Sequence, residues 1–219
     1  MATAKGERRR AAVVAAAARL VLADGPAGVT HRRVAEAADV PLAATTYYFS
    51  GRDDLLAAAG ERIVDSWVVA AERVAQRAQE RAGDAEDAVQ TGAGEAARAY
   101  GGLVDDLLAA LLPPKVGEIR GHYEHLVAAG RDKALARAYR AGRTQLDAAT
   151  AKILAAHGVS VPPDLVLALL DGSVVTALSE GRQVRAHARD TLLRALPTLG
   201  GPDREVTRGG CAATGTGHT

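Results

Sequence analysis

Residues 30–49 contain the feature that most constrains the fold, two short helical patterns separated by a very short turn. Thr30 is expected to cap the first helix, which then starts at His31, because a threonine hydroxyl accepts a hydrogen bond from a free N–H of the first turn. Asp39 is the expected turn residue, since aspartate tolerates the left-handed conformation. Pro41 suits the first position of a second helix that ends at Phe49. The pattern predicts a helix-turn-helix.

The second helix carries side chains suited to reading DNA in a groove. Small Ala and Thr residues permit close approach, and their methyl and hydroxyl groups can meet base edges. We expect base-edge contacts from Leu42, Ala43, Ala44 and Thr46. The expected phosphate contacts are Thr30, Arg32, Tyr47, Tyr48 and Arg52, and His31 is a further DNA-binding candidate. The alternative is a buried helical hairpin, but paired tyrosines beside small polar residues make a poor core.

Charge is distributed unevenly along the chain. The total is +1, whereas residues 1–52 hold eight Lys or Arg and four Asp or Glu, a net +4, which leaves −3 for the rest. A basic front and an acidic body indicate a protein whose N-terminal end faces DNA. The basic run at residues 5–10 is expected to precede the first helix, either as an unstructured arm that reaches DNA or only as a solubilising charge run.

These segments resemble the TetR family of one-component transcriptional regulators. RRAAVVAAAARLVLADG is similar to the first helix of that family, and YYFSGRDDLL to its junction between the recognition helix and a long fourth helix. The similarity covers about residues 8–56. The buried positions of the first helix would be Val13, Ala17, Leu20 and Val21. The resemblance implies a homodimer that an inducer releases from DNA.

The chain departs from the family pattern within the motif itself. Asp39 stands at the turn, where glycine is most frequent in the family, and Pro41 replaces the usual serine at the start of the recognition helix. Leu42 replaces a frequent lysine, and Thr46 replaces an aromatic residue. Fewer charged base contacts are therefore available, and the operator cannot be inferred by analogy.

Composition favours an all-α fold. Aromatic residues make up 3% of 219 residues, so Ala, Val and Leu must form the core, and no segment reads as a strand. We expect an N-terminal arm and helix-turn-helix domain at 1–50, a helical ligand-binding and dimerisation domain at 51–197, and a disordered tail at 198–219. The chain has no apolar run long enough to span a membrane and no secretory segment, and its one cysteine is Cys211. We expect a cytoplasmic protein with no membrane partner.

Two features organise the expected body. A long helix opens with a capping box at Ser50 and Asp53, and its apolar stripe could transmit movement to the DNA-reading end as a lever. That stripe is Leu56, Gly60, Ile63, Trp67, Ala70, Val74 and Ala78. The helix after Pro163 is apolar nearly all round, which predicts burial against a second copy of the chain, or else a central place in its own domain. The expected dimer interface is Leu135, Gly142, Leu146, Ala149, Ile153, Leu165, Leu169 and Val174. A final helix is expected to end before Pro197.

The body is also expected to enclose an apolar cavity for a small-molecule inducer of unknown identity. Polar and aromatic groups able to orient a ligand are Trp67, Tyr100, His122, Tyr123, His125 and Tyr139, although ordinary packing is the commoner role for each of them taken singly. His122 and His125 lie one helical turn apart, but they lack an obvious carboxylate or thiol partner, so we assign no metal site.

No enzyme motif is present: the sequence has no nucleophile elbow, phosphate-binding loop or dinucleotide fingerprint. We therefore assign no catalytic residue and no cofactor. The sequence predicts a ligand-responsive, sequence-specific regulator that binds double-stranded DNA, most simply a repressor released from a palindromic operator by a small apolar ligand. The alternative is an all-α ligand-binding or enzymatic protein that only retains a helix-turn-helix.

Overall fold

The computed structural model describes residues 4–86 and 93–200, with the backbone alone at 84–86 and 93–99. Every regular element in these ranges is helical, which confirms the all-α prediction. In chain order they are α1 Ala4–Asp24, the 3-10 turn η1 Pro26–Gly28, α2 His31–Ala37, α3 Leu42–Tyr48, α4 Arg52–Glu86, α5 Ala93–Leu111, α6 Val116–Ala129, α7 Lys133–Ala156, α8 Pro163–Ser179 and α9 Val184–Leu199.

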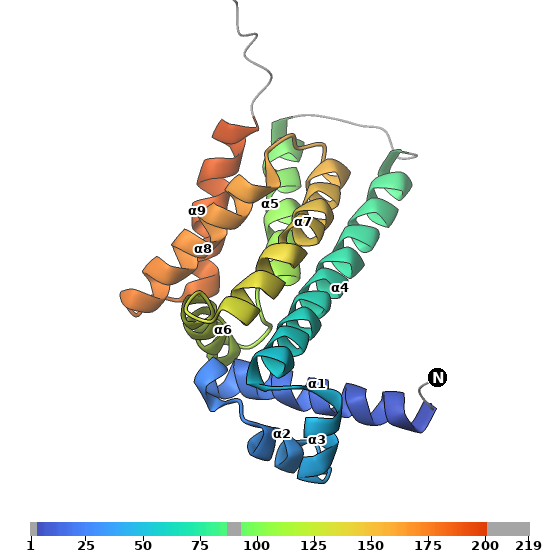
Figure 1. Ribbon diagram of the computed structural model, residues 1–219. Helices are drawn as coiled ribbons and strands as arrows, with labels where there is room; N and C mark the ends of the chain where they lie inside the picture. Colours follow the sequence, from blue (N-terminus) through green and yellow to red (C-terminus); the bar gives the residue numbers. More distant parts are fainter. Residues whose placement is uncertain (1–3, 87–92, 201–219) are drawn as a thin grey trace, which may run out of the picture.

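The helices form a small N-terminal unit and a larger body (Figure 1). Helices α1 to α3 lie at one end, and α4 rises from them along the side of the body. Each part has its own hydrophobic core, and α4 contributes to both: Leu56 and Ile63 pack in the N-terminal core, and Val74 and Ala75 in the core of the body. A movement of α4 therefore disturbs both cores.

Helices α4 and α7 pack closely because each places a glycine at the contact. A Cβ atom added at Gly142 would lie 1.9 Å from Cγ1 of Val64, and one added at Gly60 would lie 2.7 Å from Cδ1 of Leu135. Ala149 and Ile153, further along α7, are likewise fully buried within the single chain.

This packing changes the interpretation of the apolar stripe on α7. The expected dimer residues Leu135, Gly142, Ala149 and Ile153 are covered by the protomer itself, so their burial needs no second copy. Leu146 is half-buried and packs at the edge of the body core. A stripe in the sequence indicates that one face of a helix is buried, but it does not identify the element that covers that face.

Several helix ends differ from the sequence-based expectations. The basic run at residues 5–10 lies inside α1, which starts at Ala4, because Ala, Arg and Glu are good helix formers. Pro41 is the N-cap of α3 and not its first helical residue. Helix α9 continues through Pro197 to Leu199, since a proline in the last turn removes only one helical hydrogen bond.

The start of α4 has the expected capping contact between Ser50 and an acidic side chain, but the acid is a different one. Oδ2 of Asp54, rather than of Asp53, accepts from the backbone N–H of Ser50 at 3.0 Å. The expected tail and Cys211 fall mostly outside the described residues. Within the described part, no helix is long and apolar enough to cross a membrane.

Candidate nucleic-acid interface and ligand cavity

The local geometry of the motif follows from the residues that predicted it. The hydroxyl of Thr30 accepts from the backbone N–H of Arg33 at 3.2 Å, which confirms the helix cap. Asp39 has a φ of 52°, which confirms it as the left-handed turn residue. Phe49 is 2% exposed and closes the N-terminal core behind α3. These contacts fix the angle between α2 and α3.

A buried threonine joins the two helices of the motif. Thr45 is fully buried, and its hydroxyl donates to the carbonyl of Leu42 at 2.8 Å. With that hydrogen already donated, the hydroxyl can only accept from Nδ1 of His31, which lies at 3.1 Å. The ring of His31 therefore positions α3. The DNA contact that the sequence suggests for His31 stays a prediction.

Two arginines that the sequence analysis passed over also hold the motif in place. Arg33 forms an ion pair with Asp24 at the end of α1 and donates to the carbonyl of Gly28 at 2.8 Å. Arg19 on α1 donates to the carbonyl of Ala37 at the end of α2 at 3.1 Å. No sequence pattern marks these residues, because their partners are 5 to 18 positions away along the chain.

Helix α3 turns its candidate base-reading side chains outward. Leu42 is 51% exposed, and the neighbouring phosphate candidate Tyr47 is 82% exposed. Ala43 and Thr46 are exposed as well, and Ala44 is half-buried. Large exposed apolar groups are costly in water unless a partner covers them, so this face is suited to a groove lined with base edges.

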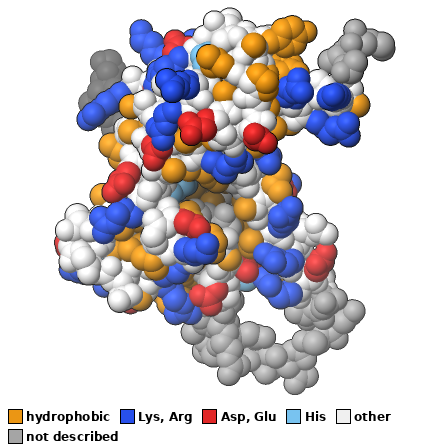
Figure 2. Space-filling view, turned by 90° about the horizontal axis from the view of Figure 1, so that it is seen from below, with side chains coloured by type: hydrophobic (Ala, Val, Ile, Leu, Met, Phe, Trp, Pro, Cys, Tyr) orange, Lys and Arg blue, Asp and Glu red, His pale blue; other side chains and the backbone are white. Residues whose placement is uncertain are grey.

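The candidate phosphate contacts surround that face but are not equally free. Thr30 and Arg32 are exposed, whereas Tyr48 is half-buried and its ring lies 5.0 Å from that of Tyr47. Figure 2, seen from the side of α2 and α3, shows Lys and Arg side chains spread over this end of the molecule. The positive charge suits attraction to a phosphate backbone.

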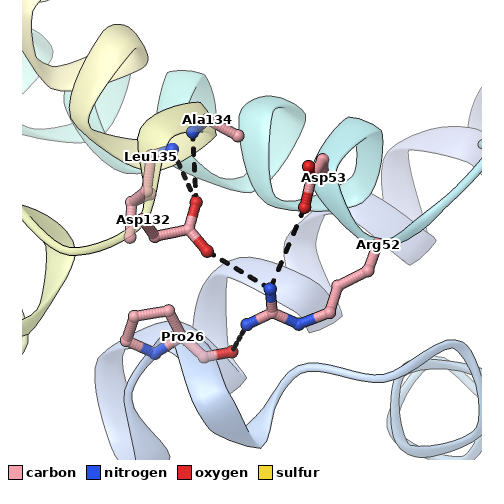
Figure 3. Close-up of polar contacts among 6 residues, drawn as sticks. All are labelled: Pro26, Arg52, Asp53, Asp132, Ala134 and Leu135. Carbon is pink, nitrogen blue, oxygen red and sulfur yellow. Dashed lines mark hydrogen bonds and ion pairs between the residues drawn. The ribbon is translucent and has the colours of Figure 1, made fainter.

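Arg52, another phosphate candidate, is engaged within the chain (Figure 3). Its Nη2 donates to the carbonyl of Pro26 in η1 at 2.8 Å, and its Nη1 donates to Oδ2 of Asp132 at 3.2 Å. The other oxygen of Asp132 caps α7 by accepting from the N–H groups of Ala134 and Leu135. Arg52 thus joins the DNA-facing unit, the first turn of α4 and the start of α7 at one point.

The body encloses a cavity of about 520 Å³. This volume is within the range of sites that hold small organic molecules. Its walls come from α1, α4, α5, α6, α7 and α8, as well as the turn after α5. The lining includes Leu22, Trp67, Glu118, His122, Tyr139, Arg143 and Asp171.

The structure gathers five of the six expected ligand-orienting residues. Trp67, His122 and Tyr139 line the cavity, with the ring of Trp67 at 4.9 Å from His122 and 5.3 Å from Tyr139. His125 packs behind them, its ring 5.2 Å from that of His122. Tyr123 lies next to His122 and reaches Asp171. The sixth, Tyr100, packs against the core of the body and is not part of the lining.

The two histidines are neutral at neutral pH. Burial, together with the nearby His125, lowers the pKa of His122 to about 4. Burial also lowers the pKa of His125, against the opposing effect of its bond to the backbone of Gly121. Because the Gly121 carbonyl can only accept, Nδ1 of His125 carries the proton and Nε2 is an acceptor. Within the described residues, no group of three His, Cys, Asp or Glu could hold a metal ion.

Asp171 is an acidic lining residue that was not among the ligand candidates predicted from the sequence. Its Oδ1 accepts from the hydroxyl of Tyr123 at 2.8 Å. Burial raises the pKa of Asp171, while the bond from Tyr123 and the charge of Arg143 act in the opposite direction. A single acid in the middle of an otherwise apolar helix was the available signal, since a charge there must face a cavity, a partner or solvent.

Comparison with known proteins identifies the family. A model described as bacterial regulatory proteins, tetR family, matches residues 13–59, and one described as tetracyclin repressor-like, C-terminal domain, matches residues 91–198. The chain therefore belongs to the TetR family of transcriptional regulators. Neither model describes an enzyme. No curated protein matches the chain.

Solved structures agree with this assignment. The multidrug binding protein EbrR in complex with ethidium is 31% identical, with a TM-score of 0.54, and the match covers 85% of this chain and 96% of EbrR. A TetR-family member from Streptomyces coelicolor A3 is 28% identical, with a TM-score of 0.53 and coverage of 86% and 98%. A regulator from Mesorhizobium loti shares the fold, at 17% identity, a TM-score of 0.61 and coverage of 90% and 98%.

Proposed function

We propose that the protein is a ligand-responsive, sequence-specific repressor that a small, largely apolar molecule releases from its operator. The observation that carries this proposal is the composition of the cavity wall. Leu22 comes from α1 of the DNA-facing unit, and Trp67 comes from α4, which spans both units. A ligand in the cavity would touch both, so its binding energy can depend on how the two units are arranged.

We expect α3 to enter the major groove, with Leu42, Ala43, Ala44 and Thr46 toward the base edges. The exposure of Leu42, Ala43 and Thr46 supports this orientation, and Ala44 beside them is half-buried. A two-fold dimer presents two such helices about one helical turn apart, so the operator should be an imperfect palindrome with half-sites near 10 base pairs or a multiple apart.

We assign the dimer contact to α8, on the edge of the body away from α4 (Figure 1). Leu165 is 45% exposed and Val175 is 50% exposed, and the exposed small residues Ala168 and Gly172 lie between them on the same helix face. The spacing of three, four and three residues makes one apolar stripe suited to a second helix. Val174 is fully buried in the core of its own protomer, so it is excluded from this contact.

A small-molecule effector is supported by the relatives as well as by the cavity. EbrR has been solved in complexes with ethidium, proflavin and malachite green. In our proposal a ligand displaces Trp67 or Tyr139, and α4 and α7 carry the displacement to Arg52 at the joint with the DNA-facing unit. The cytoplasmic location expected from the sequence stays a prediction.

The test is to select operator DNA from a randomised library with the full-length protein and then to titrate the selected DNA with and without effector. Candidate effectors come from a thermal-shift screen, since a ligand that binds the folded state raises its melting temperature. We expect a palindromic sequence and weaker operator binding when an effector is present. Ligand binding with no selected DNA sequence would favour the alternative of a ligand-binding protein that only retains the motif.

A further inference from the structure

We infer that the cavity is selective for lipophilic aromatic cations, and that Asp171 supplies the opposite charge. The inference rests on the proposed effector function and specifies its ligand class. It is carried by the position of one carboxylate, by the pairing of the other charges around the cavity, and by the aromatic groups on the wall.

Asp171 lies in the cavity wall, and the nearby charge of Arg143 acts on it without a direct ion pair. It is half-buried in α8, and one oxygen accepts from Tyr123 at 2.8 Å. In the part of the chain that the structure describes, no Lys, Arg or His nitrogen forms an ion pair with it within 4 Å. A carboxylate that has lost part of its water and lacks a directly bonded cation is costly, and a bound cation would relieve that cost.

The other charged residues of the wall already have partners. Nε of Arg143 lies 2.7 Å from Oδ1 of Asp147, one turn along α7. Glu118 is exposed and lies 3.2 Å from Nζ of Lys115 on the same side of α6. Arg143 and Glu118 are therefore engaged by direct partners, whereas Asp171 has no direct ionic partner among the described residues. With two acids and one arginine, the charged wall residues sum to −1, which disfavours an anionic ligand.

The rest of the wall suits the face of an aromatic cation. Trp67 and Tyr139 offer π faces that attract cations. Burial favours the uncharged form of His122 in the wall and of His125 behind it, because it lowers the pKa of both. The hydroxyl of Tyr139 is buried and has no hydrogen-bond partner among the described residues, so it can accept from an N–H of the ligand. Acceptors and π faces together favour a ligand that carries positive charge and N–H groups.

The chemistry also gives a dependence on pH. Protonated Asp171 carries no charge, so affinity for a cation should fall as pH falls through its pKa, which burial raises above its usual range. The groups that act on Asp171 are Tyr123 on α6 and Arg143 on α7, and His122 adds a repelling charge only near pH 4. Tyr123→Phe removes a bond that lowers this pKa, so the loss of affinity should begin at a higher pH in that variant.

The experiment compares two probes with the full-length protein in the absence of DNA. Ethidium carries a fixed charge, and 3,8-diamino-6-phenylphenanthridine, its parent without the N-ethyl group, is neutral at weakly alkaline pH. Fluorescence titration should show that Asp171→Asn weakens ethidium binding about ten- to a hundredfold and leaves the neutral parent nearly unchanged. Asp65→Asn is the matched control, because Asp65 is exposed on α4 and outside the cavity wall.

Each result separates the ligand class from the general function. Equal binding of the two probes, with no effect of Asp171→Asn, would overturn charge recognition but leave a ligand-binding regulator. If no probe binds and no compound of the thermal-shift screen does, the effector function itself fails. Should Asp171→Asn not fold, Tyr123→Phe decides: a shifted pH profile for ethidium supports the inference, and a profile identical to that of the wild type overturns it.

Discussion

The DNA-facing end and the body of this protein are specified in different ways. In the motif, residues close in sequence make both the scaffold and the functional face: Thr30 caps α2 and Asp39 makes the turn. Leu42, Ala43 and Thr46 on the helix that follows are exposed. In the body, the cavity wall combines residues from six helices, and Leu22 and Asp171 are 149 positions apart. The helix-turn-helix is thus determined by local sequence, whereas the cavity is determined by how distant helices pack.

This difference predicts how each region responds to substitution. A change on the exposed face of α3 should alter DNA recognition with little effect on folding, because that face supports no other element. A change at a contact between body helices should alter stability first, since cores are packed densely and relax only in part.

The largest effect is expected from charge on the exposed stripe of α8. Leu165→Asp combined with Val175→Asp should separate the dimer and weaken operator binding about 10²- to 10⁴-fold, because each protomer alone holds one half-site. Sedimentation velocity and an operator titration measure the two consequences. Val69→Asp is the control, since Val69 is 47% exposed on α4. A wild-type protein that is monomeric at micromolar concentration would refute the interface.

An intermediate effect is expected where α4 meets α7. Gly142→Ala places a methyl group against Val64 and should lower the free energy of unfolding by about 1–3 kcal/mol. A Cβ atom added at Gly83 on α4 would meet no atom within 4 Å. Gly83→Ala should therefore raise the free energy of unfolding by up to about 1 kcal/mol, because alanine favours the helix more than glycine does. Denaturant unfolding measures both. Val64→Ala should restore part of the loss, and an unchanged Gly142→Ala protein would contradict the close contact.

Smaller effects are expected at the DNA-facing end, divided by type. Thr46 and Ala44 variants should change base preference, each mismatch being worth about 1–3 kcal/mol, without a change in unfolding. Arg32→Ala should weaken all sequences alike and reduce the salt slope by roughly one unit. Arg52→Ala should reduce that slope less, since its guanidinium is engaged by Pro26 and Asp132. Titration of a randomised operator library at several salt concentrations distinguishes them.

The opposite result would show that another side of α3 faces the groove. If Thr46 and Ala44 variants keep the wild-type base preference while Arg32 or Tyr47 variants change it, the assignment of base and phosphate contacts is incorrect. A full unit of lost salt slope in Arg52→Ala would show that this side chain leaves Asp132 and Pro26 when DNA binds.

The sequence predicted what depends on near neighbours. The cap at Thr30, the turn at Asp39 and the apolar stripe of α4 follow from the geometry of single helices and their ends. It also indicated that Trp67, His122 and Tyr139 face inward, because aromatic and imidazole groups on an apolar helix face rarely point to solvent.

The sequence did not predict which surfaces meet. From the sequence, the apolar stripe that contains Gly142 is expected to contact a second protomer. In the structure, Gly142 instead packs against Val64 of the same chain. Asp171 was not foreseen because its importance depends on Tyr123, 48 positions away. The sequence predicts a phosphate contact for Arg52, and it does not reveal the carbonyl and carboxylate partners of this side chain, because they come from η1 and α7. Such pairings depend on the three-dimensional fold and leave no periodicity in the sequence.

The central claim is that ligand and operator bind antagonistically, and reciprocity tests it most directly. The dissociation constant of malachite green is measured for the free full-length protein and for the operator complex, with operator DNA alone as the control for dye binding. The operator constant is measured with and without saturating dye. We expect both constants to rise by the same factor, roughly 5–150-fold. Equal dye affinity for the free and the DNA-bound protein would contradict the account.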